Sequence, residues 1–123
     1  SWTGVIVPRG VPAELVAVIN EFGGKMKDSY GIPIPQIQDG IKHGVRKINV
    51  DTDSRLAMTG AVRKLLFTDP SKFDPRDWLV PARDAMKEVV KARMIAFGSA
   101  GHAKDYAPIT LADMKKRYAE GQA

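Results

Sequence analysis

The chain has 123 residues, 44% of them hydrophobic and none of them cysteine, which suits one compact domain and excludes disulfides, thiolate metal sites and a cysteine nucleophile. No apolar run approaches the roughly 20 residues of a membrane-spanning helix, and the N-terminus lacks signal-peptide features, so we expect a cytoplasmic protein without a membrane partner. The net charge of +5 and the pI of about 9.6 suit an anionic partner, but acids and bases alternate over residues 83–91, which disfavours nucleic acid and leaves an anionic metabolite.

The first third of the chain predicts a strand and two helices. Residues 3–7 form a short apolar, β-branched run, which is typical of a buried strand. Pro12 suits a first helical turn, and apolar residues recur at helical spacing until the glycines at 23 and 24. A turn rich in proline over residues 29–35 precedes a short helix expected at 36–42.

The remaining elements begin with a strand that runs directly into a helix. Residues 45–50 predict the strand, and the polar residues 51–53 precede a helix that continues to about residue 66. Helix starts are plausible near Pro70 and Pro75, and we expect Pro81 to open the longest helix, which ends at the glycine-rich residues 98–101. A last helix is expected over residues 111–118, with Thr110 as its cap.

The order of these elements predicts the fold class. Strand, helix, strand, helix and then further helix is the order of a parallel α/β sheet. Two parallel strands leave unpaired edges that need further strands beside them. The sequence therefore predicts part of a larger α/β barrel.

The end of the strand at 45–50 is the first place to look for a binding site, because α/β proteins bind ligands beyond the carboxyl ends of their strands. Asp51, Thr52 and Asp53 follow this strand directly. The amides of a helix N-terminus and the Thr52 hydroxyl suit a phosphate, while simple N-capping by Asp51 or Thr52 is the alternative. We expect Asn49 to be buried at the strand end and to need hydrogen-bond partners, of which a ligand hydroxyl is one.

The two histidines do not predict a metal site. His43 lies before the strand, at the end away from the expected site, where it suits a helix C-terminus. His102 lies in a glycine-rich turn, where we expect it to be exposed. They are far apart in sequence and have no helical spacing that would make them a metal pair.

Several stretches of the chain carry a family resemblance. These are residues 40–53, 55–63, 73–76, 81–82 and 96–101, and upstream 11–14, 23–24 and 30–31. Together they resemble the last strand and the C-terminal helices of class II fructose-bisphosphate aldolases, with the character of the longer aldolases of Calvin-cycle and related bacterial lineages. The resemblance covers residues 11–122, roughly nine tenths of the chain.

The resemblance implies a fold and an activity. The fold is α/β, the C-terminal fragment of a (β/α)8 TIM barrel with its last one or two βα units and the helices that follow. The activity is the reversible aldol cleavage of fructose 1,6-bisphosphate to dihydroxyacetone phosphate and glyceraldehyde 3-phosphate, in glycolysis, gluconeogenesis or the Calvin cycle. Family members use Zn²⁺ to polarise the ketose carbonyl. They are expected to be homo-oligomers, either dimers or tetramers.

The resemblance also assigns substrate-binding residues. Asn49 would contact the substrate near the bond that is made or broken. Asp51 and Thr52 would hold the dihydroxyacetone phosphate end, with Thr52 on its phosphate. Arg76 would reach the other phosphate across a dimer interface, a role that the fixed donor fork of a guanidinium suits.

The chain also departs from the family pattern. The catalytic aspartate and two zinc histidines of the family belong to earlier strands, and the place of a third zinc histidine is taken by residues 7–10, which include no histidine. We therefore expect no catalytic residue and no metal ligand in this chain, and no activity from the chain alone. Residues 11–123 are expected to form the barrel part. Residues 1–10 are expected to be an atypical segment, either a truncated strand or a tag remnant. A tagatose-bisphosphate aldolase and a non-catalytic barrel fragment acting as an interaction module stay open as alternatives.

Overall fold

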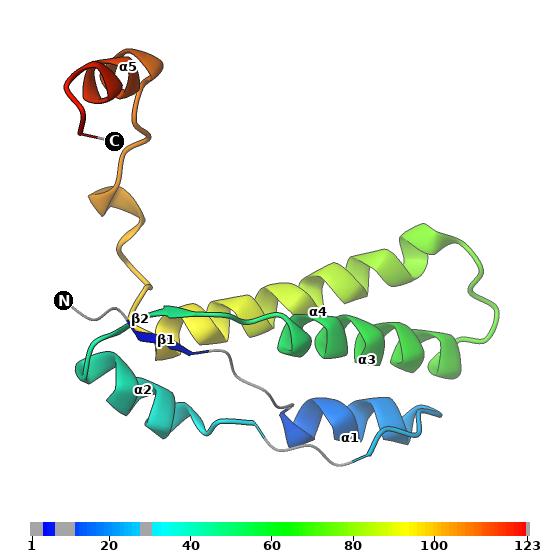
Figure 1. Cartoon of the computed structure of the whole chain (residues 1–123). Coiled ribbons are helices and arrows are strands. Elements are labelled where there is room, and N and C mark those ends of the chain that lie inside the picture. The colour runs from blue at the N-terminus through cyan, green and yellow to red at the C-terminus, as the bar shows by residue number, and fades with distance from the viewer. Residues whose placement is uncertain (1–3, 7–11, 28–30, 123) are drawn as a thin grey trace.

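We describe residues 4–6, 12–27 and 31–122 of the chain in a computed structural model (Figure 1). The described elements are mostly helices. In chain order they are β1 (Gly4–Ile6), α1 (Ala13–Glu21), α2 (Ile34–Lys42), β2 (Val45–Ile48), α3 (Thr52–Thr68), α4 (Pro75–Ala96), the 3-10 helix η1 (Ala103–Asp105) and α5 (Leu111–Ala119).

Three helices form the main packed unit. α3 and α4 lie antiparallel along most of their length, and α1 packs on α3 (Figure 1). Gly60 of α3 permits this close approach, because a Cβ atom at that position would lie 3.2 Å from Cγ1 of Val18 on α1. The apolar core is small, and its buried members are Val16, Ile19, Ile37, Leu56, Ala57 and Ala82.

The two strands form a parallel pair. Ile6 of β1 pairs with Ile48 of β2, and the register shifts between Gly4 and Val5. The pair lies beside α2 and near the C-terminal end of α4 (Figure 1), and Gln38 of α2 donates a hydrogen bond of 3.0 Å to the carbonyl of Ala96. The predicted parallel pairing is confirmed. The described residues do not close a barrel, since each of these strands has one neighbour among them.

Several predicted boundaries are confirmed to within two residues. The strand expected at 45–50 ends at Ile48, and the helix expected at 36–42 begins at Ile34. Thr110 caps the last helix, because its hydroxyl accepts a hydrogen bond of 3.1 Å from the backbone N–H of Asp113. Of the strand expected at 3–7, the two end residues lie outside the described part of the chain.

The prediction for Pro81 was wrong, as was a helix start at Pro70. Pro70 lies in a turn, and α4 runs from Pro75 through Pro81 without ending. The carboxylate of Asp74 accepts a hydrogen bond of 2.9 Å from the backbone N–H of Arg76, so a side-chain cap and a proline at the first helical position together define the start of α4. Pro81 is tolerated because packing of α4 on α3 outweighs the one lost backbone hydrogen bond.

Replacing Pro81 by alanine is therefore expected to stabilise the chain. Alanine restores a backbone N–H that can donate to the carbonyl of Asp77, and we expect the free energy of unfolding to rise by about 1–2 kcal/mol after allowing for the more flexible unfolded chain. Urea denaturation followed by far-ultraviolet circular dichroism measures it. The matched control is Pro75→Ala, which gains no helical hydrogen bond and should change stability little. Equal effects of the two variants on the free energy of unfolding would contradict the claim that Pro81 costs α4 a backbone hydrogen bond.

The C-terminal part of the chain extends away from the three-helix unit (Figure 1). Leu111 and Tyr118 lie on α5 and are 73% and 69% exposed, and Tyr106 in the preceding segment is 81% exposed.

Among the described residues, no helix combines the length and the apolar character needed to cross a membrane.

Candidate functional site

The turn from β2 into α3 carries three of the residues predicted for the site. Asp51 occupies the N-cap position of α3, but its side chain makes no capping hydrogen bond. Its Oδ1 atom instead accepts a hydrogen bond of 2.9 Å from Nε of Arg55, and its Oδ2 atom pairs with Nη2 of the same guanidinium. This hydrogen bonding by Arg55 holds the pKa of Asp51 below its ordinary value of 3.8. Asp51 is therefore a charged, exposed carboxylate rather than a side-chain cap.

Asn49 is exposed, so the expectation that it is buried at the strand end was wrong. β2 ends at Ile48, the residue before Asn49, and the side chain of Asn49 therefore lies beyond the sheet. Its Oδ1 atom accepts a hydrogen bond from Nζ of Lys47. Thr52, the first residue of α3, is also exposed. The turn thus presents an amide, a carboxylate and a hydroxyl to solvent.

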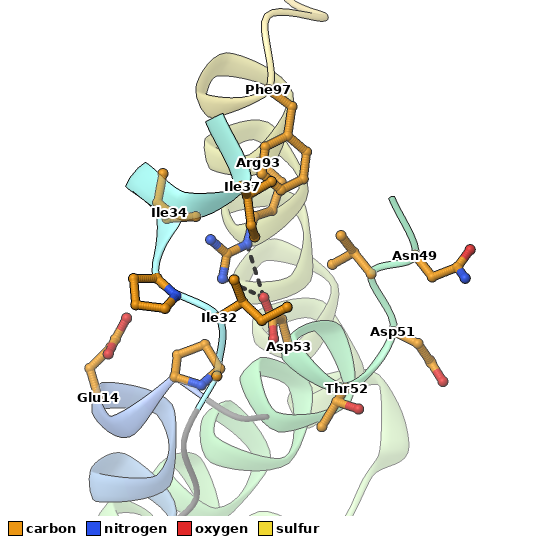
Figure 2. A pocket seen from close by; sticks show the side chains of 14 residues that line it. Glu14, Ile32, Ile34, Ile37, Asn49, Asp51, Thr52, Asp53, Arg93 and Phe97 are labelled. Atoms are coloured by element: carbon orange, nitrogen blue, oxygen red, sulfur yellow. Dashed lines mark hydrogen bonds and ion pairs between the residues drawn. The ribbon is translucent and has the colours of Figure 1, made fainter. Parts of the chain in front are cut away.

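A pocket of about 230 Å³ lies behind this turn, between α2 and the C-terminal end of α4. Figure 2 shows the apolar side chains of Ile34, Ile37 and Phe97 on one side of it, and Arg93 and Asp53 between them and the turn. The side chains of Asn49 and Asp51 point away from this pair (Figure 2). Asn49, Asp51 and Thr52 therefore border the pocket, while the polar groups of Asn49 and Asp51 point outward.

The pair of Asp53 and Arg93 joins the first turn of α3 to the last turn of α4. Oδ2 of Asp53 accepts hydrogen bonds of 2.9 Å from Nε and 2.5 Å from Nη2 of Arg93. The side chains are 13% and 24% exposed, and within the described ranges this is the one ion pair that links two helices. The sequence prediction placed Asp53 at the strand end but missed Arg93. The available signal was a basic residue in the last turn of a long helix that follows α3 through a short turn.

Arg76 lies far from the other predicted residues of the same chain. It is in the first turn of α4, and its guanidinium donates hydrogen bonds of 3.0 Å from Nε and 2.5 Å from Nη2 to Asp74. These bonds lower the pKa of Asp74 and raise that of Arg76. Arg76 and Arg93 lie near opposite ends of α4, about 25 Å apart at 1.5 Å of rise per residue. The fold therefore brings Asn49, Asp51 and Thr52 together but leaves Arg76 of the same chain at a distance.

The histidines lie away from the turn after β2. His43 is the C-cap of α2, as predicted for a helix C-terminus, and its Nδ1 atom lies 2.9 Å from the carbonyl oxygen of Asp39. Nδ1 of His102 lies 2.6 Å from a carboxylate oxygen of Asp105, and the residue is exposed. No group of three metal-ligating side chains is formed by the residues of the described ranges. These residues do not fit a zinc centre.

Comparison with known proteins gives consistent matches. A family model described as "Fructose-bisphosphate aldolase class-II" matches residues 14–102. The fructose-bisphosphate aldolase of Pseudomonas aeruginosa is 50% identical over 112 residues, which are 91% of this chain and 32% of the relative. That of Giardia intestinalis is 53% identical over 108 residues, or 88% of this chain and 33% of the relative. "Fructose-bisphosphate aldolase 2" of Rhodobacter capsulatus is 52% identical over 104 residues, which are 85% of this chain and 91% of the relative.

The extent of these matches has two consequences. The chain spans about a third of the length of the Pseudomonas and Giardia relatives, so it corresponds to a part of them. The family model nevertheless covers most of the chain, including β2, α3, α4 and the turn that carries Asn49, Asp51 and Thr52. The chain belongs to the class II fructose-bisphosphate aldolase family.

Proposed function

We propose that this chain supplies substrate-phosphate contacts to a class II fructose-bisphosphate aldolase, which cleaves fructose 1,6-bisphosphate reversibly to dihydroxyacetone phosphate and glyceraldehyde 3-phosphate. Asn49 contacts the substrate near the reacting bond, Asp51 and Thr52 hold the dihydroxyacetone phosphate end, and Arg76 binds the other phosphate. The observation that carries this proposal is the exposed polar turn at the carboxyl end of β2, in a chain of this family.

The chemistry of the turn suits a phosphorylated sugar. The first N–H groups of an α-helix have no partner within the helix and carry partial positive charge, which favours a phosphate. The exposed hydroxyl of Thr52 can donate a further hydrogen bond to a phosphate oxygen. The carboxylate of Asp51 is an acceptor for sugar hydroxyls, and its negative charge is offset by Arg55.

The proposal extends to the parts of the enzyme that this chain does not provide. We propose that residues 11–123 are the C-terminal part of a (β/α)8 barrel and that the atypical residues 1–10 carry a truncated barrel strand, because β1 pairs in parallel with β2. Both strands would then pair with further strands at their free edges. The described residues offer no zinc site, so the zinc ligands and the catalytic acid or base would come from other strands. A cytoplasmic dimer or tetramer acting in glycolysis or the Calvin cycle belongs to the same proposal. The names of the relatives favour the fructose over the tagatose bisphosphate.

Two measurements on the 123-residue chain test the proposal. Titration with dihydroxyacetone phosphate, followed by nuclear magnetic resonance, should shift the backbone amide signals of residues 49–54. Unphosphorylated dihydroxyacetone serves as the control and should shift them much less. The chain alone should show no fructose 1,6-bisphosphate cleavage in an assay coupled to NADH oxidation. Amide shifts confined to other parts of the chain would contradict the assigned residues, and chelator-sensitive turnover by the purified chain would contradict the assignment of catalysis to other strands.

A further inference from the structure

The charges around the first turn of α3 are balanced in pairs. Asp51 pairs with Arg55, and Asp53 pairs with Arg93. The two pairs differ in their surroundings: the side chains of the first are 63% and 74% exposed, and those of the second are 13% and 24% exposed. The second pair is therefore the less screened by solvent, and its two charges act more strongly on their neighbours.

The position of the second pair matters for any anion at the turn. Asp53 directly follows Thr52, within the same first helical turn. An uncompensated carboxylate at this position would repel a phosphate and reduce the effect of the positive helix terminus. Arg93 removes that repulsion with two hydrogen bonds, and it does so from α4, so that the pair also fixes the first turn of α3 against its neighbour (Figure 2).

We infer that Arg93 is a positioning residue of the substrate site. By pairing with Asp53 it neutralises the partly buried acid beside the turn, so that a phosphorylated ligand can bind at Asn49, Asp51 and Thr52. The inference rests on the proposed function, since it concerns the affinity of that same turn for phosphate. Arg93 touches no substrate in this scheme and acts only through Asp53.

The test compares three variants with the unmodified 123-residue chain. Arg93→Met should weaken the binding of dihydroxyacetone phosphate about tenfold, because an uncompensated negative charge then lies in the helical turn that binds the dianion, one residue after Thr52. The double variant Asp53→Asn with Arg93→Met should recover most of the loss, because it removes that charge as well. Arg83→Met is the matched control, since Arg83 pairs with Asp84 on the same helix at an exposed position. Its affinity should change less than twofold.

The readout is the dissociation constant from the amide shifts of residues 49–54, measured at low and at high salt. High salt should reduce the effect of Arg93→Met if the cause is charge. A purely structural role would leave the double variant as weak as Arg93→Met, and this result overturns the inference while the unmodified chain still binds. Absence of binding by the unmodified chain overturns the proposed function, and the inference with it.

A fourth variant covers the case in which Arg93→Met does not fold. Asp53→Asn alone keeps a hydrogen-bond acceptor for Arg93 and removes only the negative charge. This variant should bind dihydroxyacetone phosphate as tightly as the unmodified chain or more tightly. Weaker binding by this variant would mean that the charged pair serves the structure alone, and it would overturn the inference.

Discussion

Replacing Asn49 by alanine is expected to lower kcat/KM for cleavage of fructose 1,6-bisphosphate by about 10²–10³, the usual loss when one donor to developing charge is removed. The assay requires a complete enzyme, for which a chimera serves: residues 12–123 replace the matching third of the Pseudomonas aeruginosa relative, which is 50% identical. Asn49 suits this role because its exposed amide stands at the carboxyl end of β2. If it acts near the reacting bond, kcat should fall more than KM rises.

The chain offers a matched control for this variant. Asn20 is its other asparagine, and it makes two hydrogen bonds with the backbone of Met26 after α1, at 2.7 and 2.9 Å. Asn20→Ala should lower thermal stability by about 1 kcal/mol and leave kcat/KM within twofold of the parent chimera. A similar loss of activity in both variants would show that Asn49→Ala acts through folding, and the proposed contact with the substrate would then be wrong.

The secondary structure could be predicted well wherever local signals agreed. The spacing of apolar residues and the glycines that follow them indicated α1, α2 and β2 to within about two residues. Pro81 was the exception, because a proline favours a helix start locally but is tolerated inside a helix when tertiary packing is strong. The cap at Asp74 sets the start of α4, and the packing of α4 on α3 allows the helix to continue through Pro81. The strength of these two effects could not be predicted from the local sequence.

The candidate site could be predicted in part for a similar reason. Asn49, Asp51 and Thr52 are adjacent in sequence, so their common place at a strand end followed from the prediction of one strand. The partner of Asp53 is 40 residues away, and it could be found only once α3 and α4 were known to be antiparallel. The exposure of Asn49 was mispredicted because the strand ends at Ile48, and a shift of two residues at a strand end decides whether a side chain lies inside the sheet.

Arg76→Ala is expected to lower kcat/KM of the same chimera about ten- to a hundredfold, the loss typical of a charge-assisted contact with phosphate. The loss should appear mainly in KM, because the phosphate is remote from the reacting bond. Arg76→Lys is the control, and it should recover only part of the activity because an ammonium lacks the fixed donor fork of a guanidinium. Full activity of Arg76→Ala would show that Arg76 does not bind the second phosphate of the substrate.

The position of Arg76 adds a sharper expectation. Within one chain it lies near the end of α4 opposite Arg93, about 25 Å along the helix from the region that holds Asn49 and Thr52. The proposed phosphate contact of Arg76 therefore requires a second subunit. Two weak variants, Asn49→Ala and Arg76→Ala, should then complement each other when their subunits are mixed. A symmetric mixed dimer has one site with both residues intact, and random exchange should restore about a quarter of the parent activity. If mixing restores nothing although mass spectrometry detects mixed dimers, Arg76 does not act across a subunit interface.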